Sequence, residues 1–275
     1  QILMAPRAYD GLSARLIEQA GFKAAYMTGA GVTASLLGQP DVGLLTMTEM
    51  VEQAARIAAA IDIPVICDAD TGYGNAINVM RTVRQFEAAG VAAIHLEDQV
   101  TPKRCGHFEG KQVISKAEMA GKIEAAVEAR RDPDFVIIAR TDARAVNGLE
   151  DAMARGRSYA KAGADIVFLE APQSIDELKQ VARAFDVPSM ANMPEGGKTP
   201  LVSARELEEM GFRLVIFPGS LYRAAVPLMQ EVLRTIAAEG TTKPFLERML
   251  SFEGRSQLLG LPAIQALEEK FLHRE

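Results

Sequence analysis

The sequence predicts an α/β fold, a (β/α)8 barrel of the TIM type, and two observations predict it. Eight short apolar runs are separated, for the most part, by segments with helical patterning. Most of these runs are followed at once by polar side chains. Alternating strands and helices imply a parallel sheet with helices outside it. Eight such units close naturally into a barrel.

Four of the expected strands come from one recurring phrase. A polar, alanine-rich stretch ends in Gly, and a short apolar run follows. Gly is favoured just past a helix end because it adopts positive φ without a Cβ clash. The apolar runs are too short for helices and suit buried parallel strands. The phrase therefore predicts a helix, a cap and a strand, and it occurs at residues 18–27, 87–96, 161–169 and 208–217.

The other expected strands follow Pro or a polar turn, at 64–67, 135–139 and 188–191, with a first strand near 3–6. The eight strands thus centre near residues 4, 25, 66, 94, 137, 167, 190 and 215. A doubly wound open sheet is the alternative. Such a sheet usually carries a Gly-rich phosphate-binding turn after an early strand, and Gly72-Tyr73-Gly74 only weakly resembles one.

The chain has no low-complexity linker and no break in composition. We therefore expect a single barrel domain over residues 1–275, in which a helix at 219–238 completes the barrel. Residues 239–275 form a C-terminal helical extension, with helical patterning at 243–251 and 262–271. Barrels of this kind often fill about 200–250 residues as one domain.

Composition excludes several classes of protein. The chain has 275 residues, of which 48% are hydrophobic and 24% charged, and this is unlike a disordered chain. Two cysteines make no disulfide framework and fit a reducing cytosol, so we expect a cytoplasmic protein. No apolar run approaches the roughly 18 residues of a membrane span. The net charge of −6 argues against nucleic-acid and anionic-membrane partners. The sequence begins at Gln1 and leaves open whether a targeting segment preceded it.

Polar side chains gather where five consecutive strands are expected to end. In a barrel these carboxyl ends meet at one face, which is where functional residues lie. A polar residue after one strand is ordinary loop chemistry, but this repetition favours a shared site. The side chains are Tyr26 and Thr28, Asp68 and Asp70, Glu97 and Asp98, Arg140 and Asp142, and Glu170, with Asn192 after the seventh strand.

The carboxylates suggest a hard divalent cation. Mg²⁺ prefers oxygen ligands and usually keeps several waters beside one or two carboxylates. Asp68 and Asp70 are two residues apart, so on an extended strand end they would face the same side. The alternative is that one of them caps the helix expected from Asn75, although that leaves the second Asp without a role.

The segment 103–107, Lys-Arg-Cys-Gly-His, is the most distinctive stretch. Neighbouring positive charge lowers a thiol pKa, so Cys105 could act as a nucleophile or as a general acid–base. The alternative is an incidental basic surface loop. One Cys and one His supply too few ligands for zinc. Gly106 and Gly110 let the loop move, which suits a lid that closes over a substrate.

Several motifs in register resemble the isocitrate lyase and phosphoenolpyruvate mutase superfamily, and within it the short-chain lyases. The resemblance runs from about Tyr9 to Arg223. The motifs are the 103–107 loop, Asp-Ala-Asp-Thr-Gly-Tyr-Gly at 68–74, Leu-Glu-Asp-Gln at 96–99, Ile-Ala-Arg-Thr-Asp-Ala at 138–143, Leu-Glu-Ala at 169–171 and Ala-Asn-Met-Pro-Glu at 191–195.

This resemblance implies an Mg²⁺-dependent carbon–carbon lyase. Such an enzyme would cleave a 2-hydroxy di- or tricarboxylate, of the 2-methylisocitrate or 2,3-dimethylmalate type, to pyruvate and a second carboxylic acid. Asp70 would bind Mg²⁺ directly, while Asp68 and Glu97 would hold its waters, and Mn²⁺ can substitute. No partner other than this small carboxylate and further copies of the chain is implied.

The resemblance also assigns the remaining residues. Tyr26 would take the proton of the C2 hydroxyl, and Cys105 would protonate the departing carbanion. The catalytic set is Tyr26, Lys103, Cys105 and His107. The substrate-binding set is Thr28, Gly29, Ala30, Asp41, Arg104, Gly106, Arg140, Glu170, Asn192 and Arg223. Phe168, Ile216, Phe217 and Pro218 would line the pocket of the departing acid.

Three alternatives remain open within this resemblance. They are a phosphoenolpyruvate or carboxyphosphonoenolpyruvate mutase, an oxaloacetate hydrolase or decarboxylase, and an inactive binding protein. The Cys-Gly-His loop favours a lyase, because the similar phosphoenolpyruvate mutases and phosphonopyruvate hydrolases lack it. The resemblance further implies a homotetramer whose C-terminal helices exchange between subunits.

Overall fold

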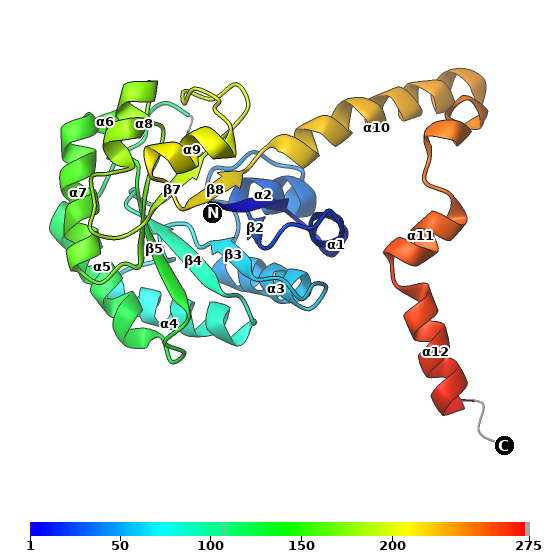
Figure 1. The fold of residues 1–275 in the computed structure, drawn as a ribbon, viewed down its shortest axis with the longest axis horizontal. Coiled ribbons are helices and arrows are strands. Elements are labelled where there is room, and N and C mark those ends of the chain that lie inside the picture. Colours follow the sequence, from blue (N-terminus) through cyan, green and yellow to red (C-terminus); the bar gives the residue numbers. More distant parts are fainter. Residues whose placement is uncertain (107, 273–275) are drawn as a thin grey trace. The chain divides into compact units, whose positions relative to one another are not determined.

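The barrel expected from the sequence is present in the computed structural model, which describes residues 1–106 and 108–272. Eight parallel strands pair in chain order, and β8 closes on β1 (Figure 1). The strands are β1 (Leu3–Ala8), β2 (Ala25–Met27), β3 (Val65–Asp68), β4 (Ala93–Glu97), β5 (Val136–Thr141), β6 (Ile166–Leu169), β7 (Ser189–Asn192) and β8 (Leu214–Phe217).

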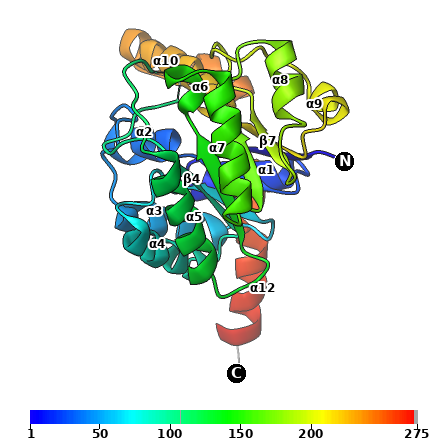
Figure 2. The ribbon, with the colours of Figure 1, turned by 90° about the vertical axis from the view of Figure 1, so that its left-hand side faces the viewer.

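Helices cover the outside of this barrel, and α4, α5 and α7 follow one another around it (Figure 2). Several of these helices begin directly after a polar residue whose side chain caps the first turn. For example, the Asn75 side chain accepts hydrogen bonds from the amides of Ile77 and Asn78 at 3.0 and 3.3 Å, which caps α4. Asn75 itself is thus the cap, and neither Asp68 nor Asp70 is needed there. The helices are α1 (Gly11–Gln19), α2 (Gly29–Leu37), α3 (Met47–Ala58), α4 (Ala76–Ala88), α5 (Lys116–Ala129), α6 (Ala143–Val146), α7 (Leu149–Lys161), α8 (Ile175–Val181) and α9 (Ala204–Met210).

The glycines of the recurring phrase end helices as expected. Gly21, Gly90, Gly163 and Gly211 have φ of 86°, 82°, 102° and 122°. These values are in the left-handed region, where a Cβ atom is disfavoured. Each of the four glycines therefore lets the chain turn from a helix into the following strand.

Side chains alternate between the two faces of each strand, so the hydrophobic core has one part inside the barrel and another between the barrel and the helices. Tyr26, Ile138 and Phe168 belong to a cluster inside the barrel. The intervening side chains point outward and pack under the helices. Ile216 faces the interior as expected, whereas Phe217 packs in the outer cluster. Phe217 is therefore wrongly placed by the sequence analysis, because neighbouring residues on a strand face opposite sides.

The chain divides into two compact units, Gln1–Ser220 and Leu221–Glu275. The second unit contains most of α10 (Ser220–Glu239), a 3₁₀ helix (Lys243–Arg248), α11 (Phe252–Leu258) and α12 (Leu261–Leu272). The helical pattern in the sequence did not predict α11, and it extended the preceding helix to residue 251, whereas the 3₁₀ helix ends at Arg248. Within this unit Arg248 binds the Glu231 carboxylate through two hydrogen bonds of 2.8 and 3.0 Å. The single-domain organisation stays a prediction. Among the described helices, none combines the length and apolarity that crossing a membrane requires.

Candidate active site

The carboxylates after β3 lie buried at the mouth of the barrel. Asp68 ends the strand, and its Oδ1 accepts the amide of Asp70 at 3.0 Å. Asp70 itself has a φ of 47°, so the chain has turned there and the extended geometry assumed from the sequence ends at Asp68. The two carboxylates are nevertheless held together by this turn. Burial raises the pKa of Asp70 to about 6, although Lys103 opposes the rise. Burial would raise the pKa of Asp68 as well, but His95 and Lys103 hold it below its usual value.

Lys103 ties the 103–107 segment to this mouth. Its ammonium lies 2.7 Å from Asp41 Oδ1 and 2.8 Å from Asp70 Oδ1, and the side chain is 4% exposed. The Asp41 carbonyl also accepts the amide of Cys105 at 3.2 Å. Asp41 therefore fixes the segment at Lys103 and at Cys105 itself, whose side chain is half-buried.

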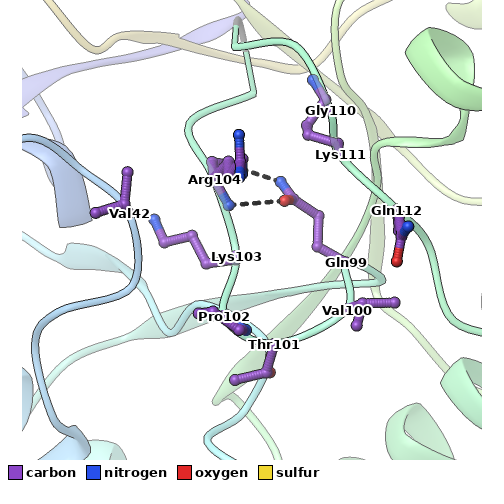
Figure 3. Close-up of a pocket in the computed structure, with 10 residues that line it drawn as sticks. All are labelled: Val42, Gln99, Val100, Thr101, Pro102, Lys103, Arg104, Gly110, Lys111 and Gln112. Carbon is purple, nitrogen blue, oxygen red and sulfur yellow. Dashed lines mark hydrogen bonds between the residues drawn. The ribbon is translucent and has the colours of Figure 1, made fainter.

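A cavity of about 660 Å³ lies along this segment and is drawn in Figure 3. Gln99 clamps the backbone there, because its side-chain amide binds the carbonyl and the amide of Arg104 at 2.8 and 2.9 Å (Figure 3). The Arg104 side chain is exposed, and its Nη1 reaches the Glu109 carbonyl at 3.5 Å. Arg104 is therefore not brought to the carboxylates in this structure.

Arg140, at the end of β5, has its guanidinium held by acids. Nε and Nη2 donate to Asp142 at 2.9 and 3.1 Å, and Nη1 lies 3.1 Å from Glu97 Oε2. Its planar group also lies over the ring of Phe168, 5.3 Å from the ring centre. These contacts fix the orientation of a fork that suits carboxylate binding.

Glu170 and Asn192 form a second polar pair on the neighbouring strands. The Asn192 amide nitrogen lies 3.1 and 3.3 Å from the two oxygens of Glu170. Asn192 Oδ1 is buried and accepts no hydrogen bond from the described residues. A Cβ atom on Gly106 would lie 2.7 Å from Arg140 Nη2 and 2.9 Å from Glu170 Cγ, so the segment passes directly over this part of the mouth.

Tyr26 has a partner inside the barrel that sequence analysis did not identify. Its hydroxyl lies 2.7 Å from Nε2 of His95, and the same nitrogen lies 3.6 Å from Asp68 Oδ1. Burial raises the pKa of Tyr26 well above its usual value. Burial also lowers the pKa of His95 to about 4. The pair is therefore neutral near pH 7.

Thr28, Gly29 and Ala30 form the N-terminal turn of α2, with Thr28 as the N-cap residue. The amide of Gly29 donates to Asp68 Oδ2 at 3.1 Å. A Cβ atom on Gly29 would lie 2.9 Å from that oxygen, which explains why Gly stands there. The N-terminus of a helix attracts anions, so this turn suits a carboxylate.

The carboxylates of Asp68, Asp70 and Glu97, called the acid cluster below, offer oxygen ligands for a cation but do not form a complete coordination shell. Within residues 1–106 and 108–272, no group of three or more His, Cys, Asp or Glu side chains is arranged to hold a metal ion. Glu97 Oε1 is buried and has no hydrogen-bond partner among these residues. Burial raises the pKa of Glu97 well above its usual value, and Asp142 adds to the effect while Arg140 opposes it. A site with one or two carboxylates and several waters, as Mg²⁺ prefers, fits this donor set.

Most of the predicted site residues thus converge at one end of the barrel. His107 lies outside the described residues, and Arg223 belongs to the second unit, so both assignments stay predictions. His95 and Lys111 were not among the residues predicted from the sequence, whereas Asp142 was expected at the end of its strand but had no assigned role. His95 had a signal, since it lies two residues before Glu97 and a strand places both on one face. Lys111 had none.

Comparison with known proteins agrees with this geometry. The family described as phosphoenolpyruvate phosphomutase matches residues 1–237. A 2,3-dimethylmalate lyase from Eubacterium barkeri is 48% identical over 271 residues, which cover 98% of this chain and 94% of that enzyme. A 2-methylisocitrate lyase from Aeropyrum pernix is 47% identical, over 94% of this chain and 83% of that enzyme. A crystal structure of 2,3-dimethylmalate lyase superposes with a TM-score of 0.93 at 42% identity, over 98% of this chain and 90% of that one. The chain therefore belongs to the PEP mutase/isocitrate lyase superfamily and is an enzyme of its lyase or mutase kind.

Proposed function

We propose that this enzyme cleaves the C2–C3 bond of a 2-hydroxy di- or tricarboxylate, of the 2,3-dimethylmalate or 2-methylisocitrate type, to pyruvate and a second carboxylic acid. One observation carries the proposal. A thiol-bearing segment is anchored over the acid cluster, because Lys103 bridges Asp41 and Asp70 while Cys105 binds Asp41 through its amide. A lyase needs a proton donor at that place, whereas a phosphoryl mutase does not.

Magnesium is part of the proposal. Asp70 would bind it, with Asp68 and Glu97 holding its waters. The buried Glu97 Oε1, which has no hydrogen-bond partner in the part of the chain that the structure describes, supports this assignment. When bound, Mg²⁺ supplies a Lewis acid that lowers the pKa of the substrate hydroxyl. The carboxylates outnumber their cations in this region, and a divalent charge would offset their mutual repulsion.

Tyr26 accepts the proton of the C2 hydroxyl in this proposal, and His95 makes that transfer feasible. A neutral phenol can accept a proton only as its own proton moves on. His95 Nε2 lies 2.7 Å away and takes that proton when the imidazole carries its hydrogen on Nδ1. The C2 oxygen then becomes the keto oxygen of pyruvate, and the electron pair of the C2–C3 bond moves to C3. The Cys105 thiol delivers the proton that C3 needs.

The substrate carboxylates have separate binding groups. The N-terminal turn of α2 and Arg140 would hold the carboxylate that becomes part of pyruvate. Glu170 and Asn192 would face the second fragment, where Asn192 Oδ1 still has an unused acceptor among the described residues. Phe168 and Ile216 provide apolar surface in the barrel interior below.

The test is product analysis with defined substrates. The purified protein is incubated with 2,3-dimethylmalate or 2-methylisocitrate and Mg²⁺, and products are identified by proton NMR. We expect pyruvate with propionate from the first acid or pyruvate with succinate from the second. A parallel incubation with phosphonopyruvate and phosphoenolpyruvate is followed by phosphorus NMR. Interconversion of those two compounds, without pyruvate from either hydroxy acid, would identify a mutase and overturn the proposal.

A further inference from the structure

Lys111 is a buried lysine on the loop between Val100 and Ile114, which also carries Cys105 and is called the Cys105 loop below. The proposed mechanism gives Lys111 no role. The base of this loop is fixed by main-chain hydrogen bonds, from Val100 N to Gln112 O and from Ile114 N to Asp98 O, both 2.9 Å. From that base the Lys111 side chain, which is 2% exposed, reaches back towards the barrel. Its ammonium donates to the Gly106 carbonyl and lies 3.5 Å from Asp142 Oδ1. A buried ammonium is stable only with such partners.

The first partner, Gly106, is the residue that follows Cys105. Its backbone lies against Arg140 and Glu170, since a Cβ atom there would come within 2.7 Å of Arg140 Nη2. The residue whose carbonyl Lys111 binds therefore lies directly against the proposed carboxylate-binding groups. Holding this carbonyl also restricts where the adjacent thiol can go.

The second partner, Asp142, is a rigid anchor on the barrel. Its amide donates to Asp98 Oδ1 at 2.9 Å, and its carboxylate holds the Arg140 guanidinium. Asp98 is in turn fixed by Tyr159 and Arg155 of α7, which donate to its Oδ2 at 2.8 and 3.1 Å. Asp142 thus connects the strand end, the outer helix and the substrate-binding arginine.

We propose that Lys111 is a positioning residue that couples closure of the Cys105 loop to the orientation of Arg140. Its ammonium joins the Gly106 carbonyl to the Asp142 carboxylate, so the thiol is held in place by the same acid that orients the carboxylate-binding arginine. The inference rests on the proposed roles of Cys105 and Arg140. Whether Lys111 holds the loop closed over the barrel can be measured without any substrate, through the accessibility of the Cys105 thiol.

The experiment measures how fast iodoacetamide alkylates Cys105 in the purified full-length protein, by mass spectrometry. Lys111→Met removes the ammonium, Lys111→Arg keeps a cation, and Lys198→Met is the matched control. Lys198 also contacts this loop, with its ammonium 2.5 Å from Glu109 Oε1, but the Glu109 side chain is 86% exposed there. Cys67 is fully buried and reports on unfolding within the same molecule.

We expect Lys111→Met to speed alkylation of Cys105 about tenfold, as the loss of one buried charged hydrogen bond implies. Lys111→Arg should restore most of the protection, and Lys198→Met should change the rate less than about twofold, since exposed ion pairs contribute little. Loss of a cation near a thiol by itself disfavours the thiolate and slows alkylation. A faster reaction therefore reports opening of the loop.

Asp142→Asn is the second variant and weakens the other end of the contact. It should also speed alkylation of Cys105, and the Lys111→Met/Asp142→Asn protein should react no faster than the quicker single variant. With a cleaved substrate, Lys111→Met should lower kcat more than it raises KM. Unchanged Cys105 reactivity in both single variants, or additive increases in the double variant, overturns the inference. Failure of the wild-type protein to cleave either hydroxy acid would instead count against the proposed function and leave the alkylation result standing.

Discussion

The Tyr26 hydroxyl and His95 Nε2 lie 2.7 Å apart inside the barrel, although Tyr26 is on β2 and His95 on β4, the strands on either side of β3. Their rings are nearly parallel, with an interplanar angle of 17°. Tyr26 is 3% exposed and His95 is fully buried. Because water does not reach the imidazole, its protonation opposes folding.

His95 should therefore make the metal-free protein less stable on the acid side. Burial lowers the pKa of His95 from 6.5 to about 4, so between these values the unfolded chain binds a proton that the folded chain does not. The contribution of His95 to the free energy of unfolding should fall as pH drops from 6.5 to 4, whereas the raised pKa of Asp70 acts in the opposite direction, so the wild type is compared with a His95→Gln protein. For this group the total is about 3 kcal/mol, and no more is lost below that range. Urea unfolding in EDTA at several pH values measures this. A His95→Gln protein with an equally steep pH dependence would contradict the assignment.

Replacing Cys105 by Ser should slow turnover severely while substrate still binds. A hydroxyl has nearly the size of a thiol but a much higher pKa, so it is a poor proton donor. We expect kcat to fall about 100-fold or more, which is the usual scale for loss of a general acid, with little change in KM. Steady-state kinetics with the cleaved hydroxy acid measures both. The matched control is Cys67→Ser, which alters a buried thiol on β3 away from the loop. Near-normal kcat in Cys105→Ser would remove the thiol from the mechanism.

Asp70→Ala should weaken divalent-cation binding independently of activity. Mn²⁺ replaces Mg²⁺ at oxygen sites, and its paramagnetic resonance signal distinguishes free from bound ion. Titration of the purified protein with Mn²⁺ should give one tight site per chain, lost in Asp70→Ala. The exposed Asp134→Ala protein is the control for removal of one carboxylate and should bind as the wild type does. Equal Mn²⁺ binding by Asp70→Ala and the wild type would refute the metal assignment.

The second unit should hold the protein together as a homotetramer. Its helices expose large apolar side chains, among them Leu233, Phe252 and Leu267 at 64%, 79% and 51%. Such surface is normally covered by a partner, and symmetric exchange of an element between subunits covers it in a closed assembly. Light scattering should give about four times the chain mass. Deletion of residues 255–275 should lower that mass and weaken activity. A monomeric wild-type protein at micromolar concentration would disprove the assembly.

The barrel could be read from the sequence because its signals are local. Gly21, Gly90, Gly163 and Gly211 end helices through a backbone conformation that the residue type itself favours. The short apolar runs mark strands that are buried on both faces. Once eight such units are counted, closure places Asp68, Glu97 and Arg140 at one end of the barrel, because carboxyl ends of parallel strands face the same way.

The partners of these residues depended on the tertiary structure. The chain turns at Asp70 through a positive φ, so its contact with Lys103 does not follow from a spacing of two residues. His95 pairs with Tyr26 across β3, and Lys111 reaches Asp142 from a different strand end. Sequence patterns report which residues share a face, since that depends on period alone. Distances between residues far apart in the chain arise only when the barrel closes and loops fold back over it, so the ion pairs that orient the site were decided there.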